Sequence, residues 1–434
     1  MYIRGEGKDR IILLIFVDDA ITVCHKDTLA SWKREFQEGW EIRDYGEPKT
    51  FLGCDIERDR KTKRIKLFQA TYIENIAKRL GLTSSHPIHT PFEPNQILTA
   101  QDGTGPTDAS EYRSIVGMLM YAVTMSRFDC AYQVKELARH LSCPTQQHMK
   151  AARRVARYLF HHRDRGVIFN ISNDVLCGYS DSNFCNCVDT RRSTGGYICM
   201  LYGAPIAWQS KLQPSISHST AEAEIRALNQ CNLKVLWLRR LCADVTGEPV
   251  TGPTPLYCDN RAAELWTRNP QHFARQQHID RCDLSVREQV LEFKTVTVHL
   301  VPTHLQLADC FTKSLALPAF RRNIEQLMEY QPTAMESTSS EEGSAMHALE
   351  VQQMSTQSFI DASRSIDKII ISHSHVENEC TSREMSTASR HGGMLNYSCP
   401  GRNLMSETFV KQFNLKRSEY LSRKITKRQF YGQD

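Results

Sequence analysis

The sequence lacks an apolar run long enough to cross a bilayer. The longest, Ile11 to Val17, falls far short of the roughly 20 residues that a transmembrane helix needs. The N-terminus also lacks the positively charged segment and apolar stretch of a secretory signal. We therefore expect an intracellular protein that makes no contact with a membrane.

Metal-binding and redox cysteine motifs are also missing. The chain has 15 cysteines, but no two of them form a C-x-x-C pair, and the closest two, Cys185 and Cys187, have one residue between them. This spacing excludes a zinc ribbon or a thioredoxin-like motif and favours reduced thiols.

A strong charge of either sign is absent. The formal net charge of +5 is a mild basic excess, which on its own does not indicate a nucleic-acid partner. With 434 residues and 41% hydrophobic composition, the chain is long enough for two or three packed domains.

Two adjacent acids lie between apolar runs near the N-terminus. Ile11 to Cys24 reads I-I-L-L-I-F-V-D-D-A-I-T-V-C, which predicts a strand, a tight turn at Asp18 and Asp19, and a second strand. Such acids are either turn residues or metal ligands. A two-metal site needs a further carboxylate nearby, but Asp9, on the same predicted strand, would lie roughly 30 Å away. Asp9 therefore cannot complete such a site with this hairpin.

A polar stretch with prolines and glycines from Pro87 to Pro106 predicts a linker or extended loop. Helical periodicity then predicts helices over Ser114–Met125, Cys130–Leu141 and Gln146–His162. The third helix has an apolar face and a basic face, and the basic face is formed by Lys150, Arg153, Arg154 and Arg157. Such a face is either simply solvated or binds phosphate backbones, and both interpretations remain open.

The pattern next changes to strands. Val167 to Phe169 is the first, and Val175 to Tyr179 leads into Asp181 at the end of its strand. Gly195–Tyr202 and Pro205–Gln209 predict a hairpin, so three antiparallel strands are expected in sequence.

The segment S-H-S-T-A-E-A-E-I predicts the start of a helix. Ser219 and Glu222 match a capping box, in which the serine caps the helix and the glutamate binds back to the serine N–H. Glu224 is two residues further on and is not needed for capping. It is therefore the better metal-ligand candidate.

Two more acids complete a set of four. The order strand, helix, strand predicts a parallel crossover that places Asp181 and Asp259 at one edge of the sheet. After a strand over Val296–Val301, Asp309 leads into a helix that continues past Lys313. Four acids at the ends of elements favour a functional cluster over four unrelated surface residues.

Several motifs resemble the Pol polyprotein of copia-type retrotransposons. F-V-D-D at residues 16–19, followed by Y-G-E-P-K-T-F-L-G-C-D-I-E, is similar to the reverse transcriptase hairpin and the segment after it. Y-S-D-S-N, S-T-A-E-A-E, C-D-N-R-A-A, Q-H-I-D and Q-L-A-D-C-F-T-K are similar to motifs of the family's ribonuclease H. The resemblance runs from residue 1 to about residue 325.

This resemblance implies an α/β chain in four parts. Residues 1–90 would be a truncated α+β reverse transcriptase palm, with Asp18 and Asp19 as its second carboxylate motif and the rest of the polymerase before residue 1. Because no further carboxylate lies near this hairpin, we expect no polymerase activity from this part alone. Residues 91–163 would be a helical thumb or connection, and residues 164–330 a ribonuclease H-like mixed sheet flanked by helices. Residues 331–434 are rich in Ser, Thr, Glu, Gln and Met, which predicts a mostly disordered tail with a basic C-terminal end.

The resemblance also implies two Mg²⁺ ions, with Mn²⁺ as an alternative, held by Asp181, Glu224, Asp259 and Asp309. In the family's pattern Asp181 binds both ions. Asp309 binds the ion beside the attacking water, and Glu224 and Asp259 bind the ion beside the leaving group. His304 is either a mobile proton carrier, since an unperturbed histidine has a pKa near 6.5, or a loop residue without a chemical role. His278 and Asp280 are expected to orient the helix before the last strand.

We therefore expect a reverse transcriptase-associated ribonuclease H that hydrolyses RNA in RNA–DNA hybrids by two-metal catalysis. Its partners would be the hybrid and other segments of a Pol polyprotein. The resemblance implies a protein that is either cytoplasmic within a particle or nuclear. The alternative is a catalytically silent, nucleic-acid-binding retrotransposon remnant. A third hypothesis is a longer natural polyprotein with protease, integrase and polymerase upstream.

Overall fold

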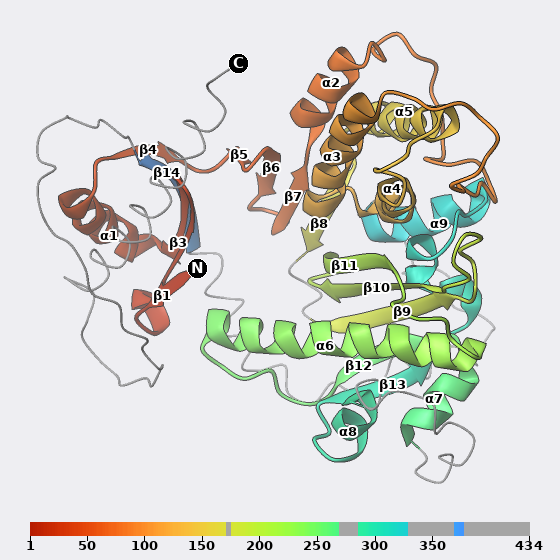
Figure 1. Cartoon of the computed structure of the whole chain (residues 1–434). Helices are drawn as coiled ribbons and strands as arrows, with labels where there is room; N and C mark the ends of the chain where they lie inside the picture. The colour runs from red at the N-terminus through yellow and green to blue at the C-terminus, as the bar shows by residue number, and fades with distance from the viewer. Residues whose placement is uncertain (171–174, 269–284, 329–368, 377–434) are drawn as a thin grey trace, which may run out of the picture.

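The computed structural model describes residues 1–170, 175–268, 285–328 and 369–376. It contains three sheets with helices packed on them, which confirms the mixed α and β architecture (Figure 1). Every helix within these ranges is too short or too polar to span a membrane.

The N-terminal sheet has the strand order β1-β2-β3-β14-β4. Its elements are β1 Tyr2–Arg4, β2 Ile11–Phe16, β3 Asp19–His25, α1 Lys26–Gly39, β4 Ile42–Gly46 and β14 Ile369–Val376. Alternate residues of β2, Ile11 and Leu13, are buried against Trp32 and Phe36 of α1, as expected for a sheet with one covered face. Strand β14 falls within the tail that was predicted to be mostly disordered, and the rest of that tail lies outside the described residues.

The second sheet joins two segments that are distant in sequence. It consists of β5 Thr50–Phe51, β6 Cys54–Asp59, β7 Arg64–Phe68 and β8 Gly166–Asn170. Gly166 lies opposite Phe68, and a Cβ at Gly166 would be 2.1 Å from the carbonyl oxygen of Leu67, so only glycine fits there. Strand β8 therefore links the predicted palm and ribonuclease H-like regions across the predicted boundary at residues 163 and 164.

The helical region contains α2 Ala70–Arg79, α3 Ala109–Met125, η2 Phe128–Cys130, α4 Ala131–Ala138 and α5 Gln146–His161. Helix α3 begins five residues before the predicted Ser114, because the Asp108 carboxylate caps it by accepting hydrogen bonds from the N–H groups of Ser110 and Glu111. The stretch predicted as a linker has no regular element but buries Phe92, so it is a packed segment.

The third sheet has the order β11-β10-β9-β12-β13, from β9 Cys177–Asn183, β10 Thr194–Leu201, β11 Ala204–Leu212, β12 Thr254–Cys258 and β13 Val296–Leu300. Strands β9, β10 and β11 are antiparallel, while β12 is parallel to both β9 and β13. The three antiparallel strands and the parallel crossover were both predicted, and both are confirmed. The remaining helical elements are α6 Thr220–Thr246, α7 Arg261–Arg268, α8 Ser285–Leu291, η5 Thr303–Leu305, η6 Leu307–Phe311 and α9 Leu317–Met328.

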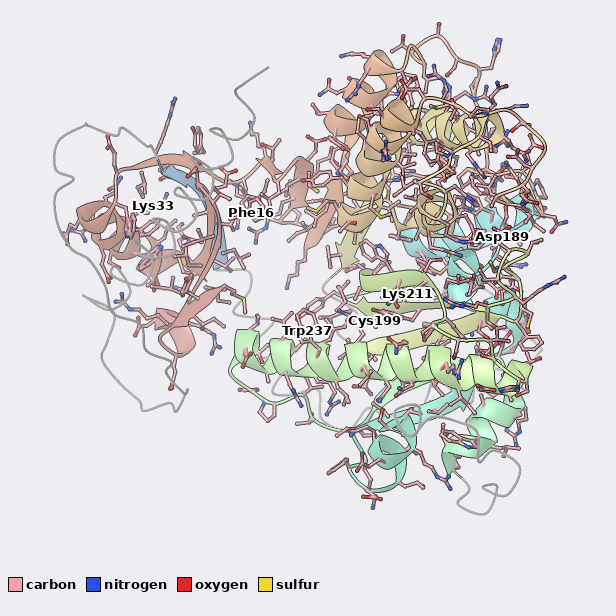
Figure 2. The ribbon with its side chains drawn as sticks, in the orientation of Figure 1. Phe16, Lys33, Asp189, Cys199, Lys211 and Trp237 are labelled. Atoms are coloured by element: carbon pink, nitrogen blue, oxygen red, sulfur yellow. The ribbon has the colours of Figure 1, made fainter. Side chains whose placement is uncertain are left out.

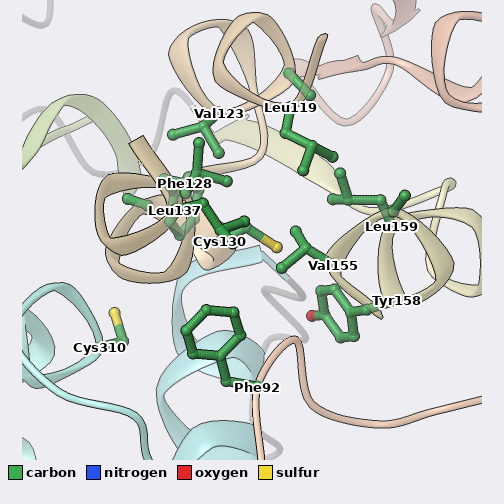
Figure 3. Packing of buried hydrophobic residues seen from close by; sticks show 14 of the residues in the cluster. Phe92, Leu119, Val123, Phe128, Cys130, Leu137, Val155, Tyr158, Leu159 and Cys310 are labelled. Atoms are coloured by element: carbon green, nitrogen blue, oxygen red, sulfur yellow. The ribbon is translucent and has the colours of Figure 1, made fainter. Parts of the chain in front are cut away.

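Both faces of this sheet are covered. Neighbouring residues of β10 point to opposite faces: Cys199 packs into the core that contains α6, whereas Ile198 packs into a core shared with helices α3 to α5. Figure 3 shows part of this shared core, in which Phe128, Cys130 and Leu137 of the helical region lie together. Cys310 of η6 belongs to the same cluster of buried residues. One face of the sheet therefore shares a hydrophobic core with helices α3 to α5, and the other face packs in a second core with α6.

Candidate active site

Asp181 lies within strand β9 rather than at its end. The strand continues to Asn183, and Asp181 lies opposite Gly196 of β10. The prediction that Asp181 ends the strand is therefore wrong, because hydrogen bonding to β10 extends the strand by two further residues. Asp181 is only 3% exposed.

Gly196 allows the segment that carries Asp309 to approach the sheet. A Cβ at Gly196 would lie 2.7 Å from the Cβ of Phe311 and 2.9 Å from Cγ2 of Thr312, closer than carbon atoms can pack. The glycine thus leaves room for η6 to lie directly on β10 beside Asp181.

Asp259 follows the last residue of β12. In the parallel pair, Leu256 lies opposite Gly178 and Tyr257 opposite Tyr179, so two residues further on Asp259 is level with Asp181. The next residue, Asn260, begins helix α7 by accepting a hydrogen bond from the N–H of Ala263 at 3.0 Å.

Glu224 reaches the cluster from α6. The predicted cap at Ser219 is confirmed, since its hydroxyl accepts from the Glu222 N–H at 3.1 Å. Glu222 binds back to the N–H of His218 at 2.7 Å, one residue before the predicted donor, and also pairs with Arg226. Glu224 instead accepts a hydrogen bond from the Ser182 N–H at 3.3 Å, next to Asp181.

Asp309 lies on the short 3-10 helix η6, not on the longer helix that was predicted. The loop is held by Gln306, which is 1% exposed, donates to the Ser180 carbonyl at 3.0 Å and accepts from the Ala308 N–H at 3.2 Å. These bonds fix the loop against β9, because both ends of the amide are occupied.

The structure thus brings the predicted acids together. One carboxylate oxygen from each of Asp181, Asp259 and Asp309 lies within 4.8 Å of the others. Asp181 accepts a hydrogen bond from the Thr312 hydroxyl, and the Lys313 ammonium lies 2.8 Å from Asp309 Oδ1.

Crowding and burial disfavour the ionised acids. Burial raises the pKa of Asp181 to about 6, with Lys313 opposing the rise and Asp309 and Asp259 adding to it. Burial, reinforced by Asp181 and Asp259, raises the pKa of Glu224 well above its ordinary value. Burial likewise raises the pKa of Asp309. The cluster is therefore short of positive charge.

The donor set fits a hard divalent cation. All four acids offer oxygen atoms, which are the ligands that Mg²⁺ and Mn²⁺ prefer. Glu224 is 3% exposed, and its Oε2 has no hydrogen-bond partner, although buried carboxylate oxygens are normally satisfied. A cation in the cluster would satisfy this atom.

Lys313 and Thr312 were not identified as site residues from the sequence. Both belong to the Q-L-A-D-C-F-T-K segment that carries Asp309, and the spacing of four residues between Asp309 and Lys313 was the available signal. His304 lies exposed on η5, five residues before Asp309, and its role stays a prediction. His278 and Asp280 lie outside the described residues.

The basic face of α5 is partly engaged within the chain. Arg153 donates to the Leu80 carbonyl at 2.7 Å, and Arg154 lies 3.3 Å from Glu93. Lys150 is exposed, while Arg157 is partly buried. Two of the four predicted nucleic-acid contacts thus have a structural role here, and nucleic-acid binding by this face stays a prediction.

The N-terminal acids lie apart from this cluster. The predicted hairpin is confirmed, but its tight turn is formed by Val17, with a positive φ of 57°, and Asp18, whereas Asp19 is already the first residue of β3. Phe16 at the hairpin and Cys199 in β10 belong to separate parts of the molecule (Figure 2). Asp9 lies on a 3-10 turn before β2, so its predicted place on the same strand is wrong.

Comparisons with known proteins extend over most of the chain. Residues 1–94 match the family model described as reverse transcriptase (RNA-dependent DNA polymerase). The chain is 33% identical over 323 residues to the retrovirus-related Pol polyprotein from transposon RE1 of Arabidopsis thaliana, covering 74% of this chain and 22% of that protein. It is 32% identical over 320 residues to the Pol polyprotein from transposon TNT 1-94 of Nicotiana tabacum, with 71% and 24% covered. The chain thus spans about a quarter or less of these relatives.

Shorter proteins match as well. A putative transposon Ty5-1 protein of Saccharomyces cerevisiae is 30% identical over 227 residues, covering 52% of this chain and 73% of that protein. Among solved structures, the N-terminal RNase H domain of a Mycobacterium tuberculosis protein, fused to maltose binding protein, matches with 12% identity and a TM-score of 0.23, covering 35% of this chain and 97% of that one. A TM-score this low supports no conclusion about the fold.

Proposed function

The chain belongs to the Pol polyproteins of copia-type retrotransposons, and on that premise we propose that its third sheet and surrounding helices form a ribonuclease H that hydrolyses the RNA strand of RNA–DNA hybrids. The observation that carries the proposal is the convergence of Asp181, Asp259 and Asp309 within 4.8 Å, beside the unpartnered oxygen of Glu224. The chain order of three antiparallel strands, a helix and a parallel strand supports it, because the resemblance to ribonuclease H implies that order.

Asp181, Glu224, Asp259 and Asp309 would hold two Mg²⁺ or Mn²⁺ ions, which when bound would lower the pKa of the attacking water and offset charge on the leaving 3′ oxygen. The chain itself prepares this site. Gln306 holds the Asp309 loop against β9, and the Thr312 hydroxyl orients the Asp181 carboxylate. His304, exposed on η5, would exchange protons with solvent near the site.

The alternative of a catalytically silent remnant is less favoured by the residues present. Mutation of an unused site would be expected to remove one of the acids, yet all four are present and three of them converge in space. An active chain would bind the hybrid on the surface around the cluster. Lys150 on α5 would be a further candidate contact with the phosphate backbone.

Cleavage of a strand-labelled hybrid by the full chain tests the proposal. The RNA strand should be cut in Mg²⁺ and left intact in EDTA, and the DNA strand should be left intact in both. Asp259→Asn should reduce cleavage by at least a hundredfold, because it removes one ligand charge at the cluster.

Glu292→Gln is the matched control. Glu292 is exposed and precedes β13, whereas Asp259 follows β12. Because these two strands are parallel, the two acids lie at opposite ends of the strands. This variant should cut as fast as the unmodified chain. A full chain that binds the hybrid in Mg²⁺ but leaves the RNA uncut would refute the proposal.

A further inference from the structure

Lys313 occupies a place that the proposed chemistry does not use. Its Nζ lies 2.8 Å from Asp309 Oδ1 and 4.0 Å from Asp181 Oδ2. A lysine side chain carries a positive charge at neutral pH, and two carboxylates face this one. A positive charge therefore already lies at the carboxylates that would bind the metal.

Resting on the proposed function, we propose that Lys313 is a built-in competitor of the divalent cation. Its ammonium neutralises part of the cluster while no metal is bound, and it must leave Asp309 when an ion binds that carboxylate. Lys313 would thus set the metal concentration at which the site fills, without taking part in the chemistry itself.

The charges explain why the exchange is favourable. Four ionised carboxylates carry four negative charges, of which one ammonium offsets one, whereas two divalent ions offset all four. The ammonium can donate hydrogen bonds to a carboxylate but cannot satisfy several of them at once within the short distances that a metal ion allows.

The side chain is also able to move. The Lys313 side chain is 37% exposed, compared with 5% for the Asp181 side chain and 13% for the Asp309 side chain, so one side of the lysine is open to solvent. Its flexible four-carbon stem lets the ammonium swing into water without moving the backbone. Displacement therefore requires a change of rotamer only.

A purely structural salt bridge gives the opposite expectation. If Lys313 served to hold Asp309 in position for the metal, its removal would weaken metal binding. Competition predicts tighter binding, because an ion no longer has to displace the ammonium. The sign of the change separates the two roles.

The test is Mn²⁺ binding to the full chain without nucleic acid, by isothermal titration calorimetry at pH 7.5. Lys313→Met should bind the first Mn²⁺ about tenfold more tightly than the unmodified chain, and Lys313→Arg, which keeps the charge, should bind within about twofold of it. Equal or weaker binding by Lys313→Met would overturn the proposal.

Lys234→Met is the matched control for loss of one positive charge. Lys234 lies on α6, stacked over Trp237 (labelled in Figure 2), ten residues from Glu224. That separation is about 15 Å along the helix, beyond the screening length of about 8 Å at physiological salt. Its Mn²⁺ affinity should match that of the unmodified chain.

A second measurement needs no variant. Acylation of Lys313 in the unmodified chain, followed by mass spectrometry, should be faster with saturating Mg²⁺ than in EDTA, because the metal releases the ammonium and exposes the amine. Unchanged or slower labelling would overturn the proposal. If neither the unmodified chain nor Asp181→Asn binds Mn²⁺, the proposed function fails. If the unmodified chain binds Mn²⁺ but Lys313→Met binds it no more tightly, only the proposed competition fails.

Discussion

Replacing Asp181 by asparagine should stabilise the metal-free protein. The difference between a pKa of about 6 in the fold and an ordinary value of 3.8 corresponds to an unfavourable contribution of about 3 kcal/mol when the group is ionised. This figure already includes the attraction of Lys313, which opposes the rise. Asparagine carries no charge, and its carbonyl oxygen can still accept the Thr312 hydrogen bond.

The pH dependence follows from the sign of this change. Because the pKa is raised in the fold, the unfolded chain loses its proton first as the pH rises through about 4, and the folded chain loses it at about 6. The stability cost of Asp181 is therefore absent below about pH 4, grows between pH 4 and 6, and is fully present above pH 6. The advantage of asparagine should follow the same course.

Thermal unfolding in EDTA measures the effect. At pH 7.5 Asp181→Asn should raise the unfolding midpoint by about 6–12 °C, because about 3 kcal/mol corresponds to that shift at about 2–4 °C per kcal/mol for a domain of roughly 150–250 residues. Adding Mg²⁺ should stabilise the unmodified chain and leave the variant unchanged, because the variant has lost a ligand.

An acid with good partners provides the control. Asp189 accepts from the Ala100 N–H at 3.2 Å and pairs with Arg139 at 3.0 Å, so the same change there should destabilise the chain. If Asp181→Asn is less stable than the unmodified chain in EDTA at pH 7.5, the inference that the cluster is short of positive charge is wrong.

Three further predictions concern stability, each measured by urea unfolding. Phe311→Ala should lower the free energy of unfolding by about 3–5 kcal/mol, because Phe311 lies in the core shared by helices and sheet. The control Leu305→Ala, at a residue 43% exposed, should lower it by less than about 1 kcal/mol. Equal effects would contradict the shared core. Asp129→Asn should cost about 3–5 kcal/mol, since it leaves the fully buried Arg127 guanidinium without its partner at 2.6 Å, and a loss under 1 kcal/mol would contradict a buried ion pair. Burial lowers the pKa of His140 to about 4, so the unfolded chain takes up a proton first as the pH falls from 6.5 to 4, and stability is lost in that window. Between pH 7.5 and pH 4.5, the free energy of unfolding of His140→Phe should therefore fall by about 2–3 kcal/mol less than that of the unmodified chain. An identical decline in both would refute the lowered pKa of His140.

Local signals in the sequence predicted most of the elements that carry the site. Ser219 caps α6 as expected because a cap depends on residues within one turn, and Glu222 takes the structural role that separates it from Glu224. The order strand, helix, strand predicts that Asp181 and Asp259 lie side by side, because strand order and handedness allow few arrangements, and the parallel pairing of β9 and β12 agrees.

Features that depend on long-range contacts were not predictable. Strand β8 pairs with β7, about a hundred residues earlier in the sequence, and no local pattern identifies that partner. The end of η6 at Phe311, two residues before Lys313, was not predicted, because it depends on how η6 packs against Gly196 of β10. The same tertiary packing converts the predicted linker around Phe92 into part of the core.

Anomalous diffraction from crystals of the full chain soaked in Mn²⁺ tests the metal site most directly. We predict an anomalous peak in contact with the carboxylate oxygens of Asp181, Asp259 and Asp309, at about 2.1–2.2 Å, with Lys313 turned away from Asp309. The same peak should be missing in crystals of Asp181→Asn. If crystals soaked in saturating Mn²⁺ show no anomalous peak at these three carboxylates, or show peaks only elsewhere, the proposed two-metal hydrolysis is contradicted.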